Sequence, residues 1–341
     1  MRCQLQFSGI SFCGSDIGGF FGDPEEELFV RWYQAAAYQP FFRSHASFDS
    51  KRREPYLLNE TPRSIVRDAI KKRYALLPLW YTMFYEHERF GAPVMRPMLS
   101  GYPLDKNVFR LDDQYMLSDK LLVRPVLNEG VTKVNVHFPS IDGDKKGERW
   151  YDTDDYKLFE SVGVQVIDVD AKKTPVYQRG GTIIPKKEII RKSSVWMRDD
   201  PVALIIAVDS DEKADGTLYV DDELSYNYQT GKYLYLKFEL NKKILTSKFV
   251  DKNANFTTKS LFDKVLIAGF KDLPPFANLK TSNGESKQLE ITKSSDLFFT
   301  IENLKISLMD EWTLDISGAK QNILCMGLIL IVSLVHAFRH M

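Results

Sequence analysis

The side chains best suited to acid–base chemistry are carboxylates that are paired or that lie in a glycine-rich turn. Adjacent pairs occur at Asp112-Asp113 and Asp221-Asp222, and Asp16 lies within the run Gly14-Ser15-Asp16-Ile17-Gly18-Gly19. Two carboxyl groups can act on one bond only if both point at it, whereas neighbouring residues of a strand point to opposite faces. We therefore interpret both adjacent pairs as turn or solvent-exposed residues and predict no catalytic dyad from them.

The cysteines offer no metal site. Cys3, Cys13 and Cys325 lie far apart, without the even count of a disulfide framework or the close pairs of a zinc site. Cys13 falls in an apolar run and is predicted to be a buried thiol. We expect no metal and no cofactor, and the cysteines leave the cellular compartment undecided.

Composition narrows the class of partner. The chain of 341 residues is long enough for two or three domains, and its 46 basic and 46 acidic residues cancel. No net field steers it towards nucleic acid or an acidic membrane surface, so we expect no nucleic-acid partner. The aromatic content of 13% suits both β-rich cores and sugar binding.

The first part of the chain alternates predicted strands and helices. Residues 5–13 form an apolar run that predicts a buried strand, and residues 38–45 are strand-like as well. A helix is predicted to start near Asp23 and Pro24, with Asp23 as its cap. A second helix is predicted from Thr61-Pro62 towards Gly91, broken at Pro78.

After Pro93 the pattern changes to short β-rich runs separated by turn residues, which is typical of β-sandwiches. The order indicates the end of a parallel (β/α)8 barrel followed by two β-sandwich modules. The predicted domains are 1–95 for the barrel end, 96–185 and 186–316 for the two modules, and 317–341 for an apolar tail. The predicted strands are residues 120–126, 133–138, 164–169, 202–208, 218–221, 233–240, 264–268, 297–301 and 312–316.

Eight motifs in a fixed order carry a resemblance to glycoside hydrolase family 31. They begin with Ser11-Phe12-Cys13-Gly14-Ser15-Asp16-Ile17-Gly18-Gly19-Phe20, Arg31-Trp32-Tyr33-Gln34, Gln39-Pro40-Phe41-Phe42-Arg43-Ser44-His45 and Arg73-Tyr74-Ala75-Leu76-Leu77-Pro78. They continue with Pro93-Val94-Met95-Arg96-Pro97, Asp113-Gln114-Tyr115-Met116-Leu117, Val123-Arg124-Pro125-Val126 and Gln178-Arg179-Gly180-Gly181-Thr182-Ile183-Ile184-Pro185. Residues 186–316 resemble the distal module of the family less specifically, and residues 1–6 and those after 317 do not resemble it.

The resemblance implies an exo-acting, retaining α-glucosidase that removes terminal glucose from oligosaccharides. Within the family, the motifs are most similar to the neutral α-glucosidases of the glucosidase II type. That similarity implies glucose trimming of N-glycans in the endoplasmic reticulum lumen, together with a non-catalytic β subunit. No cofactor is implied.

By match to the family motifs, His45 should hydrogen-bond hydroxyls of the terminal glucose, because an imidazole both donates and accepts. Phe20 should form the apolar wall for the sugar, and Asp16 should fix the local polar network. Taken without the resemblance, Asp16 reads as a turn residue, Phe20 as a core residue and His45 as a structural hydrogen-bonding residue.

Retaining hydrolysis requires a nucleophile and an acid/base whose carboxyl groups lie about 5–5.5 Å apart. In the family these are aspartates of a Trp-x-Asp-Met-Asn-Glu motif and a Gly-Asp-Asn motif, and neither motif occurs in these 341 residues. We therefore assign no catalytic residue and expect the chain to be inactive alone, which leaves open whether it acts as an enzyme. The alternative is a non-catalytic β module that binds a glycan or a partner.

Three further features concern location. The sequons at Asn59 and Asn255 are candidate N-glycosylation sites in a secretory-pathway protein. Residues 1–6 lack the apolar region of a signal peptide. Residues 323–335 are apolar except Ser333. As a helix they would span about 20 Å, less than the roughly 30 Å of a bilayer core. Membrane association through residues 323–338, as a tail anchor or an interfacial helix, and a tail without selected function both remain open.

Overall fold

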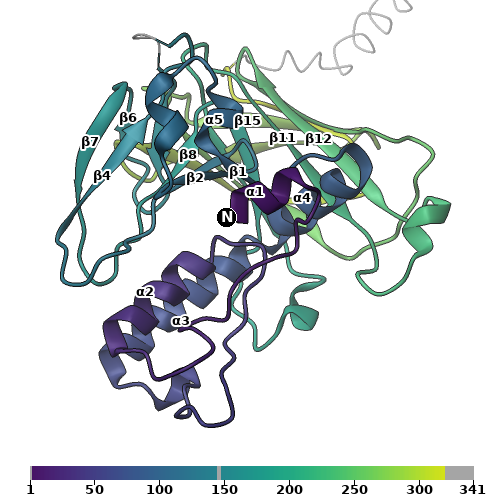
Figure 1. Ribbon diagram of the computed structural model, residues 1–341. Helices are drawn as coiled ribbons and strands as arrows, with labels where there is room; N and C mark the ends of the chain where they lie inside the picture. Colours follow the sequence, from purple (N-terminus) through teal and green to yellow (C-terminus); the bar gives the residue numbers. More distant parts are fainter. Residues whose placement is uncertain (1, 144–146, 319–341) are drawn as a thin grey trace, which may run out of the picture.

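The structure is a computed structural model that describes residues 2–143 and 147–318 (Figure 1). The apolar run at 323–335 lies outside the described residues. Figure 1 shows the strands grouped on one side of the molecule and the helices α2 and α3 extending away from them. The chain therefore divides into a helical N-terminal part, where the sequence pattern predicts strands alternating with helices, and a β-rich remainder, as that pattern predicts.

The chain begins with a helix, and the prediction of a buried strand at residues 5–13 is wrong. α1 spans Arg2–Phe7 and ends in a turn in which Ser8 and Ile10 donate to the carbonyl of Leu5. The side chain of Gln6 is 2% exposed and donates to the carbonyl of Ser11, 2.7 Å away. A strand needs a neighbouring strand for its backbone groups, whereas here a side-chain amide and a turn satisfy them.

Helices α2 (Glu26–Ala36) and α3 (Glu60–Ala75) pack side by side, with the short helix η1 (Pro55–Leu57) before α3 (Figure 1). Their shared core contains Phe29, Val30, Ile65 and Val66. The prediction that Asp23 caps α2 is wrong: the N-cap is Glu25, without a side-chain cap hydrogen bond. Asp23 instead accepts a hydrogen bond from the backbone N–H of Lys51, at 2.8 Å.

Helix α4 (Leu77–Phe90) follows α3 after a break at Leu76, which confirms the predicted interruption at Pro78. Proline fits the first turn of a helix, where its missing N–H costs no hydrogen bond. Gly91 ends α4 in the left-handed conformation, with φ 70°. The second predicted helix is therefore two helices, and the second of them packs against the β sheets.

The first sheet has six strands in the order β1-β2-β3-β8-β5-β6. The core of this part includes Trp150 and Tyr177 of the sheet together with Phe138 of β4, and all three side chains are 0% exposed. The short helices α5 (Met98–Gly101) and η2 (Lys106–Arg110) lie between β1 and β2 in sequence, and β4 and β7 form a separate pair. The strands are β1 Met95–Pro97, β2 Tyr115–Leu117, β3 Leu121–Val123, β4 Lys133–Phe138, β5 Trp150–Asp152, β6 Leu158–Phe159, β7 Gly163–Asp168 and β8 Val176–Arg179.

The second sheet has eleven strands in the order β16-β15-β19-β13-β12-β11-β9-β10-β14-β18-β17. One core contains Leu289 of β16 and Ile301 of β18, which lie near opposite ends of this order, so the sheet must curl around that core. The short helices η3 (Ser194–Met197) and η4 (Asn227–Thr230) lie in its connections. The strands are β9 Thr182–Lys186, β10 Val202–Ala207, β11 Ala214–Val220, β12 Leu234–Asn241, β13 Ile244–Phe249, β14 Leu261–Ala268, β15 Phe276–Thr281, β16 Ser286–Glu290, β17 Thr292–Lys293, β18 Phe298–Ser307 and β19 Trp312–Asp315.

The two sheets are joined at the turn between β8 and β9. Gly180 and Gly181 form this turn, and Gly181 has φ 85°. A Cβ added to Gly180 would lie 2.8 Å from the Cβ of Arg149, so only glycine fits where these two segments of the chain approach each other. The turn therefore passes directly from an interior strand of one sheet, β8, to an interior strand of the other, β9.

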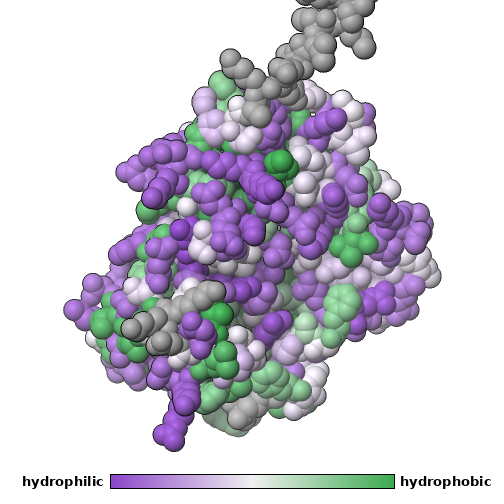
Figure 2. All heavy atoms as spheres, turned by 90° about the horizontal axis from the view of Figure 1, so that it is seen from above, coloured by the Kyte–Doolittle hydropathy of each residue, from purple (hydrophilic) through white to green (hydrophobic). Residues whose placement is uncertain are grey.

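The surface carries no single dominant apolar face in the view of Figure 2, where hydrophilic side chains surround separate apolar patches. In residues 2–143 and 147–318, no helix is both long and apolar enough to cross a membrane. The same residues contain no cluster of three His, Cys, Asp or Glu side chains that could hold a metal ion.

Candidate functional site

Two loops lie side by side, one containing the motif at residues 11–20 and the other the motif at residues 39–45. The N–H of Ile17 donates to the carbonyl of Arg43 at 2.8 Å, and Ile17 forms an isolated parallel bridge with Ser44. Further along, the N–H of Ser47 donates to the carbonyl of Phe20, also at 2.8 Å. The prediction of a strand at residues 38–45 is therefore wrong except for this single bridge. The two motifs are nevertheless hydrogen-bonded to each other through their backbones.

Glycines permit this pairing. Gly18 and Gly19 have φ 86° and 83°, in the left-handed region that side chains rarely adopt. A Cβ on Gly14 would lie 2.6 Å from the Cβ of Phe41 in the opposite loop. The glycine-rich run therefore lets one loop turn tightly and approach the other at backbone distance.

The pairing brings together Phe20 and His45, two of the three residues predicted from the family motifs. Their ring centroids are 5.5 Å apart, and both side chains are exposed, Phe20 to 39%. Phe21 packs against Phe20 edge-on, at 4.8 Å between centroids. This arrangement presents an apolar ring face beside an imidazole, which can both donate and accept hydrogen bonds.

Asp16, the third predicted residue, pairs with Arg43 of the opposite loop. The Nη2 and Nε atoms of Arg43 lie 2.6 and 2.7 Å from Asp16 Oδ1. The Asp16 side chain is 13% exposed, so one of its oxygens is occupied and partly screened from solvent. Arg43 was not singled out from the sequence, although it lies two residues before His45 in the same motif.

A second arginine, Arg73, donates hydrogen bonds to the backbone of the segment that leads to His45. Its guanidinium donates to the carbonyls of Gln39 at 2.6 Å and Pro40 at 2.9 Å, and lies 3.7 Å from the Trp80 ring centroid. Burial lowers the pKa of Arg73 to about 9, so the group is still charged at neutral pH. Sequence reasoning gave Arg73 no role, because its partners are backbone atoms.

The adjacent acid pairs differ from one another. Asp112 is exposed, and Asp113 pairs with Arg124 Nη2 at 2.7 Å. Asp222 closes a turn in which the Ser225 hydroxyl and nearby backbone N–H groups lower its pKa to about 2. The interpretation as turn or exposed residues is wrong for Asp221, which is 4% exposed and accepts hydrogen bonds from two tyrosines.

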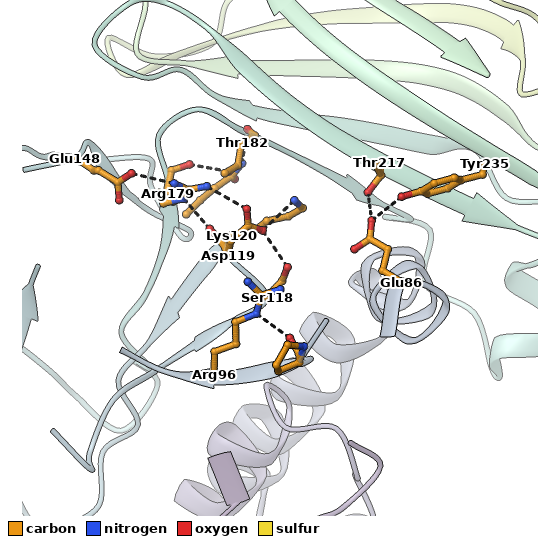
Figure 3. Close-up of polar contacts among 12 residues, drawn as sticks. Glu86, Arg96, Ser118, Asp119, Lys120, Glu148, Arg179, Thr182, Thr217 and Tyr235 are labelled. Atoms are coloured by element: carbon orange, nitrogen blue, oxygen red, sulfur yellow. Dashed lines mark hydrogen bonds and ion pairs between the residues drawn. The ribbon is translucent and has the colours of Figure 1, made fainter. Parts of the chain in front are cut away.

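The motif at residues 178–185 contributes an ion-pair network between strands (Figure 3). Arg179 donates to the Asp119 carbonyl at 2.7 Å and lies 2.9 Å from Glu148 and 3.1 Å from Asp119 Oδ2. Burial raises the pKa of Asp119, but the neighbouring charges of Lys120 and Arg179 outweigh it and hold the pKa below its usual value. Arg179 therefore stabilises the six-stranded sheet.

The remaining sequence candidates lie elsewhere. Both sequon asparagines are exposed, and Asn255 accepts a hydrogen bond from Lys232 Nζ at 2.8 Å. Cys13 is a free thiol, but it is half-buried rather than buried as predicted.

Comparisons with known proteins place these features in a family. Residues 1–83 match the glycosyl hydrolases family 31 TIM-barrel domain, and residues 91–184 match the glycosyl hydrolase family 31 C-terminal domain. The chain is 47% identical over 271 residues to neutral alpha-glucosidase AB of Dictyostelium discoideum, covering 79% of the chain and 28% of that protein. It is 40% identical over 316 residues to the Homo sapiens protein of the same name, covering 92% of the chain and 33% of that protein.

Solved structures agree. The crystal structure of a glucosidase II alpha subunit bound to Glc1Man2 has a TM-score of 0.86 and 28% identity, over 92% of this chain and 36% of the other. An endoplasmic-reticulum glucosidase II complex of the catalytic subunit and the binding domain of the regulatory subunit gives a TM-score of 0.85 and 29% identity, over 92% and 35% of the two chains.

The chain spans 28 to 40% of the length of these and similar curated relatives. Its glycine-rich loop, its Phe20–His45 pair and its β domains fall within the matched region. The chain belongs to glycosyl hydrolase family 31, with part of the TIM-barrel domain in residues 1–83 and the C-terminal domain in residues 91–184.

Proposed function

We propose that the chain is the C-terminal part of a retaining α-glucosidase, an enzyme that hydrolyses terminal α-glucosidic bonds. The observation that carries this proposal is the pairing of the loops at Ile17 and Arg43, which sets Phe20 beside His45. The names of the similar proteins, neutral alpha-glucosidases and glucosidase II alpha subunits, support it.

Each residue of this site has a distinct role in the proposal. Phe20 supplies an apolar surface for the C–H face of the terminal glucose, and His45 hydrogen-bonds its hydroxyls. Asp16 and Arg43 hold the loops in register through their ion pair and so position the other two side chains. All four act by binding and orienting the sugar, and none of them is assigned the bond-breaking step.

The bond-breaking step requires two carboxyl groups that the family takes from two aspartate motifs, and this sequence contains neither. We therefore propose that the chain does not hydrolyse glucosides alone. The barrel, proximal and distal domains proposed at 1–95, 96–185 and 186–316 would then serve recognition and folding.

The substrate proposed is a glucosylated oligosaccharide, in particular the glucose-bearing end of an N-glycan, in the endoplasmic reticulum lumen. A glucosidase II alpha subunit has been solved with Glc1Man2 bound, and a related complex contains the binding domain of a regulatory subunit. A non-catalytic β subunit is the corresponding proposed partner. The exposure of Asn59 and Asn255 is compatible with N-glycosylation in that compartment.

The test is release of 4-nitrophenol from 4-nitrophenyl α-D-glucoside by the purified chain, beside an empty-vector preparation. We expect no release above that background. Reproducible activity lost in Asp16→Asn would overturn the proposed inactivity and show that the chain carries its own catalytic site.

Sugar recognition is tested separately by saturation-transfer NMR with methyl α-D-glucoside. Transfer to the sugar should fall in His45→Ala and persist in His87→Ala, a histidine of α4 that hydrogen-bonds Ser11 outside the Phe20–His45 pair. Equal transfer in all three proteins would contradict the proposed role of His45.

A further inference from the structure

A small cavity lies between the junction of α3 and α4 and the strands β3, β8 and β9. Its volume is about 80 Å³, well below the roughly 300–1,000 Å³ of typical ligand pockets. It adjoins a larger pocket of about 610 Å³, because Tyr38, Lys72 and Asp154 line both. Phe20 and His45 line neither, so this is a different place from the candidate site described above.

The small cavity is lined by an amine and a phenol, those of Lys186 and Tyr38. Lys186 is the last residue of β9 and is half-buried, whereas Tyr38 follows α2 and is 4% exposed. In residues 2–143 and 147–318, no hydrogen bond or ion pair joins Lys186 Nζ or the Tyr38 hydroxyl to another group. Both groups are therefore available to a molecule that enters the cavity.

The acids that act on the charge of Lys186 already pair with other lysines. Asp154 Oδ1 lies 2.6 Å from Lys72 Nζ, and its other oxygen accepts from a further lysine. Glu188 Oε2 lies 2.9 Å from Lys264 Nζ. Burial is the largest cause and lowers the pKa of Lys186, the charges of Lys72 and Lys264 lower it further, and the two acids offset this only in part. A neutral amine therefore forms more readily here than at an exposed lysine.

A neutral lysine amine is a nucleophile that forms imines with carbonyl compounds. We propose that Lys186 is a covalent modification site for small aldehydes, with Tyr38 as the proton donor. Nζ bonds to the carbonyl carbon, and this bond becomes double as the carbonyl oxygen leaves. The amine loses two protons and the oxygen departs as water, with the Tyr38 hydroxyl relaying both protons from nitrogen to oxygen. The step needs neither an oxidant nor a reductant.

Burial also suits Tyr38 to this role. It raises the pKa of the Tyr38 hydroxyl, and the charges of Asp154 and Asp152 raise it further, so the group carries its proton at neutral pH. A proton donor near the carbonyl oxygen stabilises the charge that develops there during attack.

The lining of the cavity restricts the aldehyde. The buried side chains of Leu76, Leu121 and Ile184 form apolar walls. Asp154, whose side chain is 34% exposed, and Lys72 mark the side that adjoins the larger pocket. A short aldehyde with an apolar chain, such as propanal, fits these walls. The modification goes beyond the proposed glucosidase function and does not depend on it.

The experiment treats the whole chain with propanal and cyanoborohydride at neutral pH. Cyanoborohydride reduces the imine to a stable N-propyl amine, which peptide mass spectrometry quantifies at each lysine over time. Lys186 should be modified at least about tenfold faster than the exposed Lys192, because a positioned proton donor typically contributes roughly 100-fold or more. Tyr38→Phe should slow the reaction of Lys186 by at least about tenfold and leave that of Lys192 unchanged.

Two controls separate proton donation from a structural role. Because the Tyr38 hydroxyl has no partner in the described part of the chain, Tyr38→Phe should leave the Tm unchanged. Tyr226→Phe, at a position that is 76% exposed, should leave the rates at both lysines unchanged. Slower modification of Lys186 in Tyr226→Phe, equal to that in Tyr38→Phe, would contradict the role of Tyr38.

Lys187 tests the cavity itself. It is half-buried like Lys186, but it does not line the cavity, and its Nζ donates to two backbone carbonyls at 2.8 Å. It should therefore be modified far more slowly than Lys186. Equal rates at Lys186 and Lys187, or at Lys186 and Lys192, would overturn the inference.

The size of the aldehyde gives a test that needs no variant. The branched pivalaldehyde should modify the exposed Lys192 but hardly reach Lys186. A preference for Lys186 that is the same with pivalaldehyde as with propanal would show that the small cavity does not receive the aldehyde, and would overturn the proposal.

Discussion

The hydroxyl of Tyr81 donates a hydrogen bond to Asp221, with Oη 2.6 Å from Oδ1, although 140 positions separate the two residues. Tyr219 donates to the other oxygen of the same carboxylate, at 2.8 Å. Burial and these hydrogen bonds raise the pKa of both tyrosines, so both remain donors at neutral pH. A buried carboxylate thus ties α4 to the end of β11.

Removing the Tyr81 hydroxyl should loosen this connection. Tyr81→Phe is expected to lower the free energy of unfolding by about 1 kcal/mol, the usual net contribution of a hydrogen bond. It should also speed amide hydrogen exchange in α4. The matched control is Tyr226→Phe, because Tyr226 is 76% exposed. Equal exchange rates in α4 for both variants would show that the hydrogen bond does not hold the helix.

The Asp16–Arg43 pair is expected to keep the two motif loops together. Arg43→Met should accelerate exchange of the Ile17 amide, which donates to the Arg43 carbonyl, and weaken binding of methyl α-D-glucoside. Lys51→Met is the control, because Lys51 and Asp23 form an exposed pair at 3.9 Å and such pairs contribute little. Unaltered Ile17 exchange in Arg43→Met would refute the positioning role.

Arg73 should matter more for stability than any exposed arginine. Arg73→Met leaves the carbonyls of Gln39 and Pro40 without their donors in the interior. The free energy of unfolding should therefore fall by about 3 kcal/mol. Arg63→Met, which removes an exposed pair with Glu60, should change the stability much less, because exposed ion pairs contribute little. Thermal unfolding measures both, and similar losses would contradict the assignment.

Asp105, the N-cap of η2, predicts a pH dependence of stability at the contact between η2 and β4. Burial raises the pKa of Asp105, but the N–H groups of Ser140 and Asn107 and the ring of His137 together hold it below its usual value. A lowered carboxyl pKa stabilises the fold above the unfolded pKa of about 4, and this stabilisation is lost as pH falls through the folded value.

Asp105→Asn should therefore flatten the loss of stability below about pH 4, at a cost of about 1–3 kcal/mol at neutral pH. Urea unfolding followed by the fluorescence of the buried Trp150 would measure this. Asp112→Asn is the control, since Asp112 is exposed. Parallel pH profiles for Asp105→Asn and the unchanged chain would contradict the linkage.

Local patterns predicted the β-rich part well. The alternation in residues 233–240 corresponds to β12, Leu234–Asn241, and the run at 133–138 is β4. The strand predicted at residues 5–13 failed because a short apolar run suits a buried strand and a buried helix equally. Only the partner decides, and Gln6 of α1 meets its partner, the N–H of Met95, 89 positions away.

The candidate site was predictable in part. Phe20 and His45 were predicted through family motifs and lie beside each other, whereas no role was predicted for Arg43 and Arg73, whose contacts involve the opposite loop and backbone carbonyls. Asp221 was misread for a similar reason. Its two tyrosine donors include one that is 140 residues away, so no local pattern reveals its burial.

The turn at Gly180 and Gly181 also restricts where recombination between related genes can yield a protein that folds. β9 begins directly after it, and β9 lies between β11 and β10 inside the eleven-stranded sheet. A recombination crossover at the two glycines would exchange whole sheets between relatives. A crossover a few codons later would give the sheet an interior strand from one parent and its neighbours from another. Chimaeras of the first kind should fold more readily, because each sheet keeps the side chains that were selected together.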